Sequence, residues 1–126
     1  MRSPAKRDER GAAILEFAVV LPLLVLFVFG IVEFGRAYSA RIELTAAVRE
    51  GVRAAALGGD PVASTRNAAT GLKSGSITVT PTACPDDPTP GHNATVSASY
   101  PFDYDIPFFR SGTWTLKAKG VMRCGG

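Results

Sequence analysis

The sequence predicts an α+β membrane protein, in which one long N-terminal transmembrane helix continues into a small extracytoplasmic domain with a short second helix and a three-stranded antiparallel sheet. An apolar run of about 20 residues near the N-terminus is long enough to cross a bilayer. Helical periodicity then continues toward a pair of glycines at 58–59. Beyond that pair, three short β-type segments are separated by stretches rich in Pro, Gly and Asp.

The N-terminal segment divides into a polar leader and a membrane span. Residues 1–11 carry basic and acidic side chains without apolar periodicity, which predicts a cytoplasmic leader. Residues 12–32 predict the transmembrane helix, because about 20 residues at 1.5 Å per residue cover a hydrocarbon core of about 30 Å. Only Glu16 and Pro22 interrupt this run. Pro22 removes one helical hydrogen bond, and it either kinks the span or is tolerated without a role.

The orientation of the span is predicted from charge and cysteine usage together. Basic residues before the span favour a cytoplasmic N-terminus, but arginines also follow the span, so charge alone does not decide. Cys84 and Cys124 lack metal-ligand spacing and predict a disulfide in an oxidising compartment, with two free thiols as the alternative. We therefore expect a single-pass protein of the cell membrane, with residues 33–126 outside the cytoplasm. A cleaved secretory signal is the competing interpretation, but no small-residue cleavage site ends the apolar run.

The helix is expected to continue from the membrane to about Leu57. Residues at steps of three and four form one face that we expect to pack on the domain: Phe34, Tyr38, Ile42, Thr45, Val48, Val52 and Ala55. Gly58-Gly59 ends this helix, because glycine readily adopts the left-handed conformation of a helix end. Asp60-Pro61 then predicts the N-cap and first turn of a second helix that ends near Leu72.

Three strands are predicted in the C-terminal half, over residues 76–80, 94–100 and 113–122. The alternation in the last of these places Trp114, Leu116, Ala118 and Met122 on one face. The segments 81–93 and 101–112 are predicted as loops. The second loop is rich in aromatic residues, which we expect to complete the core; an exposed docking patch is the alternative.

Charge and motif content argue against several classes of function. The net charge of +3 resides largely in the leader, since residues 1–11 contribute +2 and the remaining residues +1. No basic patch therefore predicts nucleic-acid binding. The sequence has no evident nucleophile–base pair, phosphate-binding glycine loop or carboxylate dyad, so we expect no enzymatic activity and no cofactor. His92 has no companion ligand at a useful spacing, and no metal site is expected.

The most informative segment joins the leader to the span. The leader ends in Gly11, the apolar run begins with Ala12, and a single carboxylate, Glu16, lies inside that run beside Phe17. A charge within the membrane costs a few kcal/mol, which makes Glu16 a functional candidate; the alternative is a carboxylate hydrated near the interface. If the chain is cut after Gly11, the new α-amino group of Ala12 lies about one helical turn from Glu16. Amine and carboxylate then neutralise each other, in one chain or between neighbours.

This segment resembles the prepilin-peptidase site of type IV pilin relatives and, more closely, that of the TadE-like pseudopilins of tight-adherence pilus systems. The shared pattern is a glycine, a small residue, apolar residues, a glutamate, an aromatic residue and a leucine-rich span. Here the pattern is formed by Gly11, Ala12, Glu16, Phe17 and Val20-Leu21-Pro22-Leu23-Leu24. Blocks at 31–36 and 46–53 are similar to the membrane-exit and helix-continuation segments of that family, so the resemblance covers roughly residues 9–56.

The resemblance implies a pilin-like structural subunit that takes part in assembly of a tight-adherence pilus. A prepilin peptidase would cut after Gly11, Ala12 would become the N-terminus, and Glu16 would guide processing or assembly with Phe17 as its aromatic neighbour. The implied partners are the peptidase, other pilin or pseudopilin subunits, the inner-membrane assembly platform and the lipid bilayer. The chain is larger than the major tight-adherence pilins, which favours an initiating, capping or anchoring role. The alternative function is an uncleaved, single-pass, membrane-anchored binding protein of the envelope.

Overall fold

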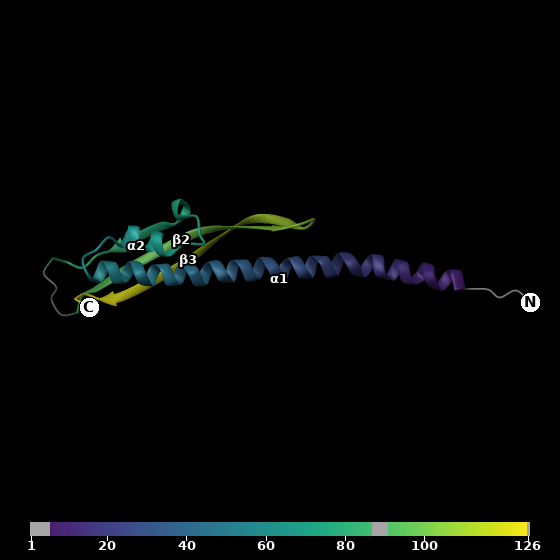
Figure 1. Cartoon of the computed structure of the whole chain (residues 1–126), viewed down its shortest axis with the longest axis horizontal. Helices are drawn as coiled ribbons and strands as arrows, with labels where there is room; N and C mark the ends of the chain where they lie inside the picture. The colour runs from purple at the N-terminus through teal and green to yellow at the C-terminus, as the bar shows by residue number, and fades with distance from the viewer. Residues whose placement is uncertain (1–5, 87–90, 126) are drawn as a thin grey trace, which may run out of the picture.

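The computed structural model describes residues 6–86 and 91–125, with side chains from residue 9 onward, and shows a long helix that extends well beyond a small α+β domain (Figure 1). The helices are α1 (Lys6–Ala56), α2 (Pro61–Ala68) and the short 3-10 helix η1 (Ser74–Ser76). They are followed by the strands β1 (Thr78–Thr82), β2 (Asn93–Ile106) and β3 (Arg110–Arg123). A long N-terminal helix, a short second helix and a three-stranded antiparallel sheet confirm the predicted fold class.

The helix α1 is continuous over 51 residues, and it passes through Gly11 and Pro22 without a break. It begins at Lys6 rather than at the predicted Ala12, because charged residues such as Lys, Arg and Glu extend an existing helix at little cost. Every side chain between residues 9 and 25 is exposed, and the most apolar window of the helix is not buried inside the protein. Length and composition therefore make α1 a candidate membrane span and support a single-pass membrane protein.

The C-terminal end of α1 is closed by the predicted glycines. Gly58 adopts a positive φ of 77°, and the amide of Gly59 donates a 2.8 Å hydrogen bond to the carbonyl of Ala54. This is the hydrogen-bond pattern of a Schellman cap. Asp60 then caps α2 through its carboxylate, which accepts hydrogen bonds from the amides of Val62 and Ala63. The N-cap prediction is confirmed.

The sheet has the order β1-β2-β3 with both pairs antiparallel, and it packs on the C-terminal half of α1. The largest fully buried side chains come from all three layers of the domain: Leu44, Val48, Thr65, Ile77 and Val96. A core of this size is small, so the close fit between α1, α2 and the sheet must supply much of the domain's stability.

The face of α1 that meets the sheet differs from the predicted one. Phe34, Tyr38 and Ile42 are more than half exposed, whereas Ala40 and Leu44 are buried. The prediction was correct toward the end of the helix, where three of its members are buried: Val48, Val52 and Ala55. Large apolar residues outnumber small ones on the predicted face, but the sheet packs closely on the face that carries alanines.

The second helix ends at Ala68, four residues before the predicted Leu72. Ala69 is buried and its amide donates to the carbonyl of Thr65, after which the chain turns back toward α1. There the amide of Gly71 donates a short hydrogen bond to the carboxylate of Glu43. A tertiary contact 28 residues away in sequence therefore ends the helix, and no local signal announces it.

β2 and β3 are longer than predicted, whereas β1 has the predicted length but lies two residues further along the chain. β1 includes Pro81, which the prediction placed outside the strand; an edge strand tolerates proline because its outward amide needs no partner. β2 and β3 extend through most of the segment 101–112, which was predicted to be a loop. Their pairing runs from Asn93↔Arg123 to Ile106↔Arg110 and forms one long hairpin. In Figure 1 this hairpin continues past α2 and β1, alongside the middle of α1.

Replacing Gly51 by alanine is expected to destabilise the domain by about 1–3 kcal/mol, as overpacked cores usually do. A Cβ at Gly51 would lie 1.9 Å from Oγ1 of Thr65, a buried hydroxyl that donates a 2.7 Å hydrogen bond to the carbonyl of Pro61. Gly35→Ala on the same helix is the matched control, since its Cβ meets nothing within 4 Å. Thermal unfolding in a mild detergent measures both; equal midpoints would contradict the close crossing of α1 and α2.

Candidate functional site

The four residues predicted to carry processing and assembly lie on the free half of α1. Gly11, Ala12, Glu16 and Phe17 are all exposed and stand clear of the folded domain (Figure 1). A Cβ added at Gly11 would meet nothing within 4 Å. Packing within the described structure therefore does not require glycine at this position, and a requirement for glycine must come from another molecule.

Glu16 has no countercharge among the helix positions one turn away from it. The residues three and four positions away, which are its neighbours on the helix surface, are Ala12, Ala13, Val19 and Val20. All four are apolar. Ala12 and Glu16 lie on the same face, separated by a rise of about 6 Å. In the intact chain, Ala12 is part of a continuous helix and offers only a backbone amide; a free amine arises there only if the chain is cut.

A polar cluster marks the level at which α1 meets the hairpin. Nη1 of Arg36 donates a 2.7 Å hydrogen bond to Oε1 of Glu33, and the guanidinium lies 5.6 Å from the ring centroid of Phe102 on β2. The other carboxylate oxygen of Glu33 is buried without a hydrogen-bond partner. The side chain of Glu33 is 13% exposed, so this ion pair is better shielded than a typical surface pair. The cluster ties the exit of the apolar segment to the sheet.

The aromatic residues of segment 101–112 are divided between core and surface. Phe102 is buried and Tyr104 half-buried, in agreement with the expectation that they complete the core. Phe108 and Phe109 are exposed, which the core prediction missed. Trp114 points from β3 toward the helix side of the sheet as predicted, but it is 62% exposed because the hairpin extends past the packed core there.

The sequence contains a feature that could have predicted the apolar turn of the hairpin. Ile106-Pro107-Phe108-Phe109 is an apolar run bracketed by Asp105 and Arg110, whereas a hairpin turn in water normally carries Gly, Asn or Asp. The loop assignment concealed this signal, because the four residues were read as part of a core-forming loop. We call these four residues the hairpin tip.

The predicted disulfide is present. Cys84, just after β1, is bonded to Cys124, at the end of β3, with a Cα–Cα distance of 5.7 Å. The amide of Cys124 also donates a 3.0 Å hydrogen bond to the carbonyl of His92. The bridge closes the domain at the end of the sheet opposite the hairpin tip, where β1 and β3 lie on either side of β2.

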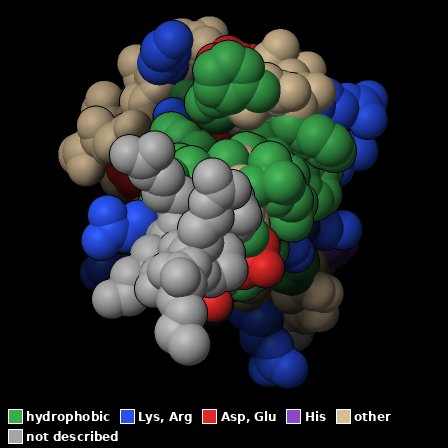
Figure 2. Space-filling model, turned by 90° about the vertical axis from the view of Figure 1, so that its right-hand side faces the viewer, with side chains coloured by type: hydrophobic (Ala, Val, Ile, Leu, Met, Phe, Trp, Pro, Cys, Tyr) green, Lys and Arg blue, Asp and Glu red, His purple; other side chains and the backbone are tan. Residues whose placement is uncertain are grey.

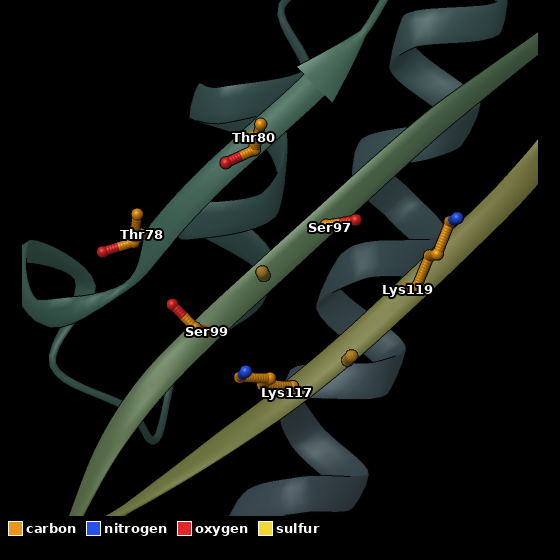
Figure 3. Close-up of a pocket in the computed structure, with 8 residues that line it drawn as sticks. Thr78, Thr80, Ser97, Ser99, Lys117 and Lys119 are labelled. Carbon is orange, nitrogen blue, oxygen red and sulfur yellow. The ribbon is translucent and has the colours of Figure 1, made fainter.

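The outer face of the sheet is polar and carries no catalytic constellation. Two cross-strand rows, Thr78–Ser99–Lys117 and Thr80–Ser97–Lys119, point away from α1, which lies behind the sheet in Figure 3. The threonines and lysines of these rows are exposed and the two serines are half-buried, so hydroxyl and ammonium groups keep this face in water. Within residues 6–86 and 91–125, no three His, Cys, Asp or Glu side chains are grouped to hold a metal ion.

Residues 11–53 match the model of the family described as TadE-like protein. This segment, here called the TadE-like segment, is similar to that family and makes up about a third of the chain. The match begins at Gly11 and ends at Arg53, so it lies wholly within α1 and confirms the resemblance seen in the sequence. No curated protein and no solved structure matches the chain.

The TadE-like segment contains the candidate processing site, the Glu16 carboxylate in the apolar run, the Glu33–Arg36 pair and most of the buried face of α1. The sheet, the disulfide and the hairpin tip lie outside the matched residues. The segments that differ most from the sequence predictions are therefore the ones without a family match.

Proposed function

We propose that the chain is a structural subunit, a pseudopilin, that takes part in assembly of a tight-adherence pilus after a prepilin peptidase cuts it behind Gly11. One observation carries the proposal. On a stretch of α1 in which every side chain from residue 9 to residue 25 is exposed, the TadE-like match begins at Gly11, and Glu16 follows within the apolar run with only apolar neighbours one turn away. Neither the glycine nor the carboxylate has a role inside the folded chain.

The cut would convert an unpaired charge into an assembly signal. An isolated carboxylate in hydrocarbon is costly, and attraction to an opposite charge is strong where the dielectric constant is low. The α-amino group released at Ala12 supplies that opposite charge one turn from Glu16, or on the helix of a neighbouring subunit. Subunits that pack so that every amine meets a carboxylate are favoured over misaligned arrangements, because misalignment leaves a charge unpaired.

The rest of the chain fits a subunit with the C-terminal domain outside the cytoplasm. The Cys84–Cys124 bridge is the kind of bond that persists in an oxidising compartment. The continuous α1 holds the domain at the end of the span without a flexible linker among the described residues. Partners would be other pilin-like helices that pack along the exposed half of α1, and the assembly platform in the membrane.

The proposal predicts a mature chain that begins at Ala12 in cells with an active prepilin peptidase. Mass spectrometry of the membrane-extracted protein should find loss of residues 1–11, and cells without the peptidase should retain them. Gly11→Leu is expected to block the cut almost completely. Gly35→Leu, which also introduces a side chain on α1 into open space, should be cut normally.

A chain that keeps residues 1–11 in the presence of the peptidase would contradict the proposal. That result would favour the alternative, an uncleaved single-pass protein whose domain binds an envelope ligand. Normal cutting of Gly11→Leu would contradict the assignment of the cleavage site alone.

A further inference from the structure

The hairpin tip lies beside the apolar segment of α1, although the two are far apart in sequence. Pro107, Phe108 and Phe109 line one cleft with α1 residues of the predicted span: Leu21, Pro22, Leu23, Val25 and Leu26. Ile106 and Phe109 line a second cleft with residues slightly further along α1: Leu23, Leu26, Phe27, Gly30, Ile31 and Phe34. No charged side chain lines either cleft.

The boundary between polar and apolar residues lies at the same level on both elements. On α1 the apolar run ends at Val32, and Glu33 is the first charge that follows. On the hairpin the charges stop at Asp105 and resume at Arg110. Ile106 lines a pocket together with Glu33, so the two boundaries face each other. A bilayer that surrounds α1 up to this level also reaches the hairpin tip.

Phe108 is unfavourable in water for two independent reasons. Its side chain is fully exposed, and its φ of 64° lies in the left-handed region that disfavours residues with a side chain. A glycine or asparagine would occupy this position without either penalty. An exposed aromatic residue held in a strained turn indicates a contact with an apolar environment outside the chain.

We propose that the hairpin tip inserts into the leaflet on the domain side of the membrane, as a second anchor beside α1 that enters this leaflet only. Acyl chains fill the two apolar clefts, Phe108 and Phe109 lie below the headgroups, and Arg110 lies among the lipid phosphates. The inference requires only that α1 spans a bilayer, and it goes beyond the proposed role in pilus assembly. Figure 2, seen from the N-terminal end of α1, shows hydrophobic side chains gathered over the helix and the hairpin above it.

The depth of insertion is limited by the hairpin itself. From Leu26 and from Leu21, which both line a cleft with the tip, the helix rises about 10 Å and about 18 Å to Glu33. The tip therefore stays within one leaflet, which is about 20 Å thick with its headgroups. β1 pairs with β2 only between Thr95 and Ser99, so the outer edges of the hairpin near the tip have no strand partner. Unpaired backbone groups are costly in hydrocarbon, and deeper insertion is therefore opposed. Trp114 and Tyr104 then lie at the interface, where such side chains are enriched.

The single tryptophan of the chain makes a direct test possible. In the full-length protein in vesicles, F108W/W114F places the only tryptophan at the tip, and K117W/W114F places it on the polar outer face of the sheet as the matched control. We expect the fluorescence of the tip variant to be blue-shifted, quenched by lipids with brominated acyl chains and no longer quenched by iodide. The control should show the opposite on all three measurements.

Two outcomes would overturn the proposal. Equal iodide quenching of the two variants would place the tip in water. Protection from iodide without quenching by brominated lipid would place the tip against protein, with a second copy of the chain as the occupant. A further variant, Phe108→Gly, relieves the strained backbone and so keeps the fold. It should lift the hairpin and shift the emission of Trp114 to longer wavelength; unchanged emission would also contradict the anchor.

Discussion

Replacing Glu16 by alanine is expected to leave the protein in the membrane and to abolish its assembly with other subunits. Removal of the carboxylate lowers the cost of inserting α1 by less than the cost of a charge at a helix centre, about 2.5–3.5 kcal/mol, because Glu16 lies near the start of the span. The protein should therefore fractionate with membranes at least as well as wild type. Assembly should fail because the amine of Ala12 then has no partner in the lipid, and an uncompensated charge in low dielectric costs several kcal/mol. Crosslinking of subunits in the membrane and counting of pili measure the loss.

Glu16→Gln separates charge from shape in this experiment. It keeps the size of the side chain and one hydrogen-bonding oxygen but removes the negative charge, and we expect it to fail nearly as completely as alanine. Glu50→Ala, an exposed carboxylate on the domain half of α1, is the control and should assemble normally. Wild-type piliation of Glu16→Ala would refute the proposed pairing of Glu16 with the released amine.

Removing the disulfide with Cys84→Ser and Cys124→Ser is expected to destabilise the C-terminal domain by about 4 kcal/mol, from the loop-closure entropy of a bridge between cysteines 40 positions apart. Small domains have total stabilities of about 5–15 kcal/mol, so the loss is a large share of what this domain has. Hydrogen exchange of the β2 and β3 amides in detergent should accelerate accordingly, while the exposed half of α1 should exchange as before.

The reduced wild-type protein is the natural control for this prediction. It should match the double serine variant, and each single serine variant should match both, because the bridge is lost in every case. A loss below about 1 kcal/mol would indicate that the unfolded domain is already held together by other contacts, since constraint of the unfolded chain is the main source of the effect.

The sequence predicted most of the helical structure because the signals for it are local. The Schellman cap at Gly58, the N-cap at Asp60 and the length of α1 depend on residues within a few positions of each other. The disulfide was predicted because the chain has only two cysteines. Errors arose where distant contacts decide: α2 ends early because Gly71 bonds to Glu43, and the loop predicted at 101–112 is a hairpin because β2 and β3 pair along their whole length.

The candidate site divides in the same way. The sequence alone singled out four residues of one short segment: Gly11, Ala12, Glu16 and Phe17. A carboxylate within an apolar run can be recognised without knowledge of the fold. The hairpin tip was not singled out from the sequence, because its proposed contact with the membrane depends on its position beside α1. The four apolar residues of the tip carry little meaning until the sheet places them at the level of the span.

By itself the sequence predicted the candidate membrane span, its continuation into the domain, the junction between the expected leader and the span, and the pair of cysteines. Apolar content, helical period and residue type are properties of neighbouring residues, so no fold is needed to read them. Only the tertiary structure decided which face of α1 is buried, how long the hairpin is, and that its tip reaches the apolar half of α1. Those features depend on strand register and on the close packing of α2 and the sheet against α1, for example at Gly51. This packing buries small residues of α1 and leaves the large apolar ones exposed.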